Sequence, residues 1–309
     1  MKILVPITLT DAMLSSSTIA EPAAGETAWN AATSYTVGQR CILTATHRVY
    51  ENLIAGVNAT SPDQALTGAT PRWLDYGPTN RWAAFDGVVN TPSTATTTFT
   101  YVVLPGFFNA IAFYGMDGAT ITVSIKTAPG GSVFYTYTGS LIEPAVDYYD
   151  YYFGTIRGLS KLVLSDILLY ANPEVTITVT AASGVTVKAG MIAFGDLRPL
   201  ISEGQMGGTQ QGASAEPFTY SYINTDAFGR TSIVRRHSAT NMRASVVLPK
   251  TDADAALATV QSVLDVPAAW IATDSVGYDG LNVYGLGSGS LGYEGPNHAT
   301  LNITVKGFI

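Results

Sequence analysis

The stretch FTYVVLPGFFNAIAFYGMDGATITVSI, residues 99–125, decides the fold class. Apolar residues alternate with Thr or Ser at a period of two, which is the pattern of half-buried strands, and Pro, Gly, Asn and Asp interrupt it. The same pattern returns in SVFYTYTG, KLVLSDILLY, EVTITVTAA, VTVKAGMIAFG and ATLNITVKGF. Many short strands at this spacing predict a sandwich or a barrel. We therefore expect a mainly β protein.

One segment departs from this pattern. In residues 251–267, TDADAALATVQSVLDVP, Thr251 or Asp252 is a candidate N-cap, and Leu257, Val260 and Leu264 recur at helical spacing before a Pro. We expect a helix here and at no other place. The stretch GLGSGSLG, 285–292, lies between strands and precedes no helix, so we expect a flexible hairpin and not a phosphate loop.

The chain divides into five predicted regions. Turn-rich stretches and a Gly/Gln/Ser-rich connection mark the boundaries. The expected regions are an N-terminal segment (1–20), a small aromatic module (21–79), a β-sandwich (80–199), a linker (200–217) and a C-terminal α+β unit with one helix (218–309).

Composition excludes several classes of function. Charged residues are 13% of the chain, the formal net charge is −7, and no cluster of cations is present to neutralise phosphates, so we expect no nucleic-acid partner. No apolar run is long enough for a membrane span. The apolar run after Lys2 is too short for a signal peptide, and Cys41 is the single cysteine, so we expect folding in a reducing cytoplasm without a disulfide.

Large aromatic residues dominate the segment 29–73. They are Trp29, Tyr35, Tyr50 and Trp73, with Gly38 at an expected turn. A unit of this size buries little surface, so its large rings can be needed as its core. The same rings can instead stack on the apolar faces of a sugar. Both interpretations stay open, and all four residues are candidate carbohydrate contacts.

This pattern, W-x5-Y-x2-G followed by Y, P and W, resembles the small three-stranded chitin-binding-type modules of bacterial chitinases, which are also embedded in many tailed-phage structural proteins. In that family the motif aromatics form the core of the module. The resemblance extends along the chain: ITLTDAMLSSSTIAE, WLDYGPTNRWAAFDG and the ending VYGLGSGSLGYEGPNHATLNITVKGF are similar to phage tail and baseplate components. The segment after WAAFDG resembles galactose-binding-like jelly rolls.

Two further groups are candidate contacts. The stretch DYYDYYFG, 147–154, predicts a strand with Tyr149, Tyr151 and Phe153 on one face. One face of this strand is available to a partner or a glycan, or alternatively the stretch is a tyrosine-rich edge strand or loop of an ordinary sandwich. Arg235, Arg236 and Arg243 are a candidate assembly interface with an acidic neighbour, or alternatively solvated strand residues.

Catalytic and metal-binding chemistry finds little support in the sequence. The three histidines are scattered, and no nucleophile elbow is present. Asp86, Asp117 and Asp166 are possible loop carboxylates, but Asp-Gly pairs more simply indicate turns. We expect no enzyme, no cofactor and no metal.

The resemblance implies a structural protein of a phage tail tip or baseplate. Its expected partners are other tail proteins and copies of itself, and its expected location is the virion, after synthesis in the host cytoplasm. The alternative is a host-surface glycan-binding adsorption protein of the same particle. A free polysaccharide-binding protein, or the accessory part of a hydrolase, is a third hypothesis.

Overall fold

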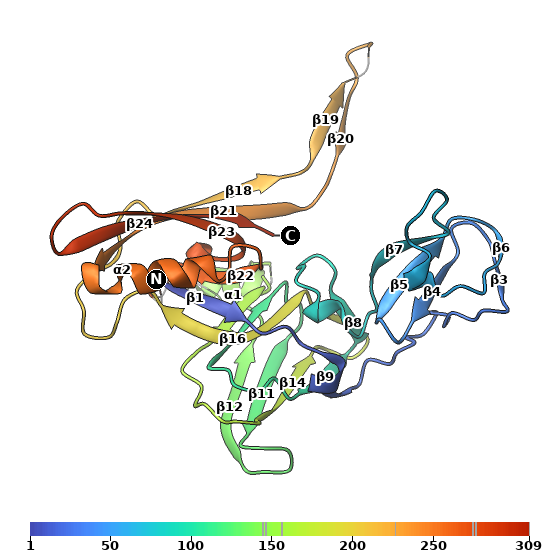
Figure 1. Cartoon of the computed structure of the whole chain (residues 1–309), viewed down its shortest axis with the longest axis horizontal. Coiled ribbons are helices and arrows are strands. Elements are labelled where there is room, and N and C mark those ends of the chain that lie inside the picture. The colour runs from blue at the N-terminus through green and yellow to red at the C-terminus, as the bar shows by residue number, and fades with distance from the viewer. Residues whose placement is uncertain are drawn as a thin grey trace.

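A computed structural model of the chain describes residues 1–143, 145, 147–155, 157–225, 227–273, 275 and 277–308. The fold is mainly β, as predicted, with two α-helices and four short 3-10 helices in this described part. Figure 1 shows a large β body, a small module beside it built from β3 to β7, and a hairpin of β19 and β20 that stands away from both.

A ten-stranded sheet runs through the β body. Nine strands follow the order β13-β10-β16-β1-β22-β23-β24-β21-β17, and β18 pairs with β21 beside β17. Their bounds are β1 Lys2–Pro6, β10 Ala110–Tyr114, β13 Lys161–Leu164, β16 Met191–Pro199, β17 Gly208–Thr209, β18 Ser214–Thr219, β21 Ser238–Pro249, β22 Ala268–Ile271, β23 Asn282–Gly292 and β24 His298–Gly307.

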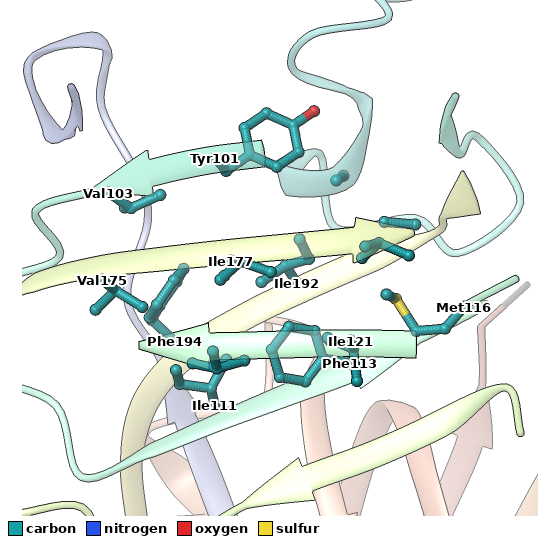
Figure 2. Packing of buried hydrophobic residues seen from close by; sticks show 14 of the residues in the cluster. Tyr101, Val103, Ile111, Phe113, Met116, Ile121, Val175, Ile177, Ile192 and Phe194 are labelled. Atoms are coloured by element: carbon teal, nitrogen blue, oxygen red, sulfur yellow. The ribbon is translucent and has the colours of Figure 1, made fainter. Parts of the chain in front are cut away.

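A second sheet of five strands, in the order β12-β11-β14-β9-β2, packs on one part of the first. Its bounds are β2 Leu14–Ser17, β9 Thr98–Val103, β11 Thr120–Lys126, β12 Val133–Ser140 and β14 Glu174–Thr180. Alternate residues of β9, β11 and β14 point inward, which confirms the period-two prediction. They meet Ile111, Phe113, Ile192 and Phe194 of β10 and β16, as Figure 2 shows. The predicted sandwich core is therefore present.

β1 lies inside the large sheet, between β16 and β22. Its neighbouring residues Ile3 and Leu4 are fully buried in two different clusters, since successive side chains of a strand point to opposite faces. The region predicted as 80–199 and the region predicted as 218–309 thus contribute strands to one hydrogen-bonded sheet, with β1 joining them.

The predicted helix is present as α2, Lys250–Gln261, but its N-cap is Pro249 and not the predicted Thr251 or Asp252. The buried residues are Ala253, Ala256 and Val260, whereas Leu264 lies beyond the helix and is half exposed. Small side chains let α2 approach the sheet closely, so the alanines face the core although Leu257 and Leu264 are more apolar. Figure 1 shows α2 lying along the sheet.

The stretch GLGSGSLG is not a flexible hairpin, because it belongs to the eleven-residue strand β23. Its glycines make room for neighbours: a Cβ on Gly285 would collide with the Lys306 carbonyl, and one on Gly287 would collide with the indole of Trp270. Glycine inside a strand often marks a position that another part of the protein approaches closely. The stretch predicted as a linker, 200–217, contains β17 and the start of β18.

The module contains a three-stranded sheet, β4-β5-β7, and the pair β3-β6, and the pair β8-β15 borders the sandwich. The bounds are β3 Ser34–Tyr35, β4 Arg40–Leu43, β5 Arg48–Asn52, β6 Gly56–Val57, β7 Trp73–Pro78, β8 Ser93–Thr96 and β15 Thr186–Ala189. The 3-10 helices are η1 Asp11–Met13, η2 Pro62–Gln64, η3 Ala83–Phe85 and η4 Asp279–Leu281.

A polar cluster joins the module to the β body. His47 stacks on Trp82 with ring centroids 4.5 Å apart, and its Nδ1 lies 2.9 Å from a carboxylate oxygen of Glu21. The other oxygen of Glu21 accepts a hydrogen bond from Thr79. The Glu21 side chain is almost fully buried, and these two partners satisfy its two carboxylate oxygens.

Candidate binding surfaces

Three of the four motif aromatics of the module are buried in its core. Tyr35, Tyr50 and Trp73 are 1–2% exposed and pack with Cys41, and Trp29 lies against this cluster, partly buried. Tyr35 meets Trp73 edge to face, with ring centroids 5.1 Å apart. A sugar cannot stack on Tyr35, Tyr50 or Trp73 unless the module opens, so their place in the structure is that of a core.

Sequence reasoning missed a different aromatic of the module. Tyr76 and Leu74 are both at least half exposed on the outward side of β7, and the Arg40 guanidinium carbon lies 3.4 Å from the centroid of the Tyr76 ring. Arg40 also pairs with Glu51 across β4 and β5 at 3.0 Å. The alternation of Trp73, Leu74, Asp75 and Tyr76 was the available signal, because Trp73 inward places Tyr76 outward.

The tyrosine-rich stretch predicted as a strand is the short helix α1, Tyr148–Phe153. The Asp147 carboxylate accepts a hydrogen bond of 2.7 Å from the backbone N–H of Asp150, which is an N-cap. This cap fixes a helical turn where the tyrosine pattern favoured a strand. The predicted face of Tyr149, Tyr151 and Phe153 therefore does not exist as a strand face.

α1 nevertheless presents a dense aromatic surface. Its five aromatic side chains are 69–84% exposed. Tyr148, Tyr151 and Tyr152 line a hollow of about 320 Å³ together with Ala145 and Asp147. Tyrosines offer a flat apolar face and a hydroxyl at little conformational entropy, which suits contact with a protein or a sugar.

The hairpin of β19, Tyr222–Thr225, and β20, Thr231–Val234, forms the tip of what we call the arm, residues 220–237. Every described residue from 222 to 237 is exposed, including Ile223 and Ile233, which pair across the two strands. Phe228 beyond them is 91% exposed. Because these side chains are exposed, the arm lacks the packing that usually stabilises a hairpin. A two-stranded ribbon without such packing is marginally stable in water.

Two of the three predicted interface arginines lie at the base of the arm. Arg235 and Arg236 line a hollow of about 480 Å³ with Tyr220, His237 and Asn90. The Arg236 guanidinium lies over the ring of Tyr222 at 5.0 Å.

The third arginine, Arg243, lies farther along β21. It pairs with Glu216 of β18 at 3.7 Å, and both side chains are more than half exposed. The structure therefore groups Arg235 with Arg236 and gives Arg243 a partner within the chain.

The three loop aspartates are not gathered at a metal site. Asp86 accepts hydrogen bonds from the Val88 N–H and the Thr91 hydroxyl, and Asp117 lies 3.2 Å from the Lys188 amine. Asp166 has a left-handed backbone, with φ of 61°. Within the described residues no group of three or more His, Cys, Asp or Glu side chains is placed to hold a metal, and no described helix has the length and apolarity to cross a membrane.

Comparisons with known proteins give little. No protein-family model matches the sequence, and no curated protein matches it. Among solved structures, chitosan-binding module 1 of a chitosanase/glucanase from Paenibacillus sp. IK-5 aligns with 37% of this chain and 82% of its own, at 12% identity and a TM-score of 0.26. A similarity this low does not bear on the function of this chain.

Proposed function

We propose that the chain is a structural assembly protein that acts by binding and not by catalysis, and that the arm docks on a neighbouring subunit. The observation that carries this proposal is the arm itself, a projecting hairpin whose two strands each carry an isoleucine, Ile223 and Ile233, that is more than 60% exposed in the described part of the chain. Exposed apolar surface of this kind is typical of interaction sites.

Charge supports an acidic neighbour. The sequence 220–237 contains three of the 16 lysines and arginines of the chain but one of its 23 aspartates and glutamates. The arm is therefore basic on a chain whose net charge is −7. Charge complementarity of this kind favours a second copy of this chain, or another acidic subunit, as the partner. A hairpin that docks on the next subunit makes a head-to-tail contact, which generates rings or filaments.

The particle that we propose is a phage tail tip or baseplate. This part of the proposal depends on the sequence resemblance of the N-terminal segment, the module and the C-terminal ending to tail components. Synthesis in the host cytoplasm and incorporation into the virion follow from it. Mass spectrometry of purified particles, with immunogold labelling of the tail, tests it directly, and absence of the chain from particles would contradict it.

Removal of the arm tests the assembly proposal. The Ser221 hydroxyl accepts a hydrogen bond from the Arg236 N–H at 2.8 Å and donates one to the Arg236 carbonyl at 3.1 Å, so a two-residue Asn-Gly turn can replace residues 222–235. We expect the wild-type chain to form oligomers in native mass spectrometry and light scattering, and the arm-deleted chain to be a monomer with an unchanged circular dichroism spectrum.

A triple variant, Ile223→Ser, Phe228→Ser and Ile233→Ser, keeps the arm and removes its three most exposed apolar side chains. It should also be monomeric. A wild-type chain that stays monomeric at every concentration, or variants that assemble as well as wild type, would refute the proposal.

The aromatic surface of α1 favours a second candidate function, adsorption to host-surface glycans. Five exposed rings beside a hollow of about 320 Å³ are suited to sugar stacking. The double variant Tyr148→Ala, Tyr151→Ala should lose binding on a glycan array, while Tyr76→Ala, which removes a tyrosine that is 56% exposed on the module, should retain it. Equal binding by both variants would exclude α1 as the contact.

A further inference from the structure

Two adjacent hollows form a continuous groove on the β body, apart from the arm and from the module. Their volumes are about 670 Å³ and 540 Å³, each within the range of small-molecule sites. Lys2, Ile271, Thr273, Ser275 and Tyr278 line both hollows. The larger one extends along β13 toward Asn282, and the smaller one extends to the residues around β17.

The polar groups of the larger hollow are held in place by the fold. Lys161 donates from Nζ to the Asn282 carbonyl at 2.8 Å, and the Asn282 side chain accepts a hydrogen bond of 2.6 Å from the buried Tyr114 hydroxyl. Burial lowers the pKa of Lys161, and nearby Asp279 opposes that effect. An amine and an amide fixed in this way lose little entropy when a ligand binds.

Carboxylates and an aromatic ring complete the lining. Asp166 and Asp279 both line the larger hollow, and the left-handed backbone of Asp166 is a conformation that non-glycine residues adopt rarely, most often at turns and functional sites. Tyr278 is 57% exposed at the rim that the two hollows share. Its ring is available to the apolar face of a ligand at the centre of the groove.

We propose that this groove binds a neutral oligosaccharide, with Tyr278 stacking on one sugar ring and Lys161, Asp166, Asp279 and Asn282 contacting its hydroxyl groups. The larger hollow is lined by Lys2 and Lys161 together with Glu143, Asp166 and Asp279, so a strongly charged ligand of either sign would meet like charges there. The smaller hollow shares Lys2 and is otherwise lined by uncharged side chains. Sugar hydroxyls donate to carboxylates and accept from amines, and therefore fit both. The elongated double shape fits a chain of sugars better than a single one.

A glycan array with neutral, anionic and amino-sugar oligosaccharides, followed by calorimetry with the best neutral ligand, tests the groove. Tyr278→Ala and Asp279→Asn should each weaken binding at least tenfold, which is about 1.4 kcal/mol. Tyr293→Ala is the matched control, because Tyr293 is 56% exposed and hydrogen-bonds Asp254 away from the groove, and it should bind as wild type does. Thermal melting checks that each variant is folded.

Three results would overturn the proposal: no binding of any neutral oligosaccharide, preference for charged ligands, or binding that Tyr278→Ala and Asp279→Asn leave unchanged. Binding lost only in the α1 variant Tyr148→Ala, Tyr151→Ala would assign the sugar to α1 and overturn the groove. The arm-deleted chain should bind the same ligand, so failure of the assembly proposal and failure of this one give different results.

Discussion

Gly287 gives the sharpest test of how β23 packs. An alanine Cβ at this position would lie closer than 3.0 Å to three atoms of the Trp270 indole, a separation that real Cβ atoms essentially never show. Trp270 is fully buried, and its Nε1 donates to the Gly285 carbonyl at 3.1 Å. The ring is rigid and enclosed, so the added methyl group must displace either the indole or the strand.

The expected loss follows from two terms. Overpacking of a well-packed core costs about 1–3 kcal/mol, and disruption of the indole hydrogen bond costs about 1 kcal/mol more. We therefore expect Gly287→Ala to lower the free energy of unfolding by ~3 kcal/mol. Urea denaturation followed by tryptophan fluorescence measures this value.

Gly292→Ala is the matched control in the same strand, because the nearest atom to its Cβ, the Thr300 carbonyl oxygen, is at 3.9 Å. It should change stability by less than about 0.5 kcal/mol. In a double-mutant cycle, Gly287→Ala should cost less in the Trp270→Phe background, since the smaller ring leaves room for the methyl group. Equal stability of the two glycine variants would refute the packing described for β23.

Three further predictions concern other cores. Trp73→Ala should destabilise the module by about 3–5 kcal/mol and unfold it while the β body stays folded, and hydrogen exchange that rises uniformly over the whole chain would contradict this. Burial raises the pKa of the Cys41 thiol from 9.0 to about 11, so Cys41 in the folded chain should resist alkylation by iodoacetamide at pH 9. The thiolate forms at a lower pH in the unfolded chain than in the folded one, so the free energy of unfolding should fall as pH rises from 9 toward 11. A Cys41→Ala variant should lack that part of the fall. Tyr101→Phe leaves the Arg81 carbonyl without its 2.8 Å hydrogen bond and should cost about 1–3 kcal/mol in thermal or urea unfolding; an unchanged stability would show that another group replaces the hydroxyl.

The alternating strand patterns in the sequence predicted the mainly β fold. The alternation in residues 98–103, 120–126 and 174–180 predicted buried faces that the structure has, because period two admits one register against a core. The pairing of strands far apart in sequence could not be predicted, since alternation says which face is buried and not which strand is the neighbour.

The errors have local causes. In DYYDYYF, tyrosines carry strand propensity, but none of the helix side chains is buried, so the Asp147 cap decides the conformation. In GLGSGSLG, glycine frequency suggested mobility, whereas the requirement is for space beside Trp270 and backbone atoms. The groove at Tyr278 was missed because its lining comes from β1, β13, β22 and the residues before β23, with no shared motif.

The position of β1 has a consequence for biosynthesis. Residues 2–6 are translated well before residues 195–199 and 269–271, with which they form their two hydrogen-bonded ladders. Until those partners have been made, β1 is an apolar strand with both edges unpaired, a state that is prone to mispairing and favours chaperone binding. The sheet therefore cannot close before residue 271 has been translated, and its closure is slow, since such distant contacts form slowly.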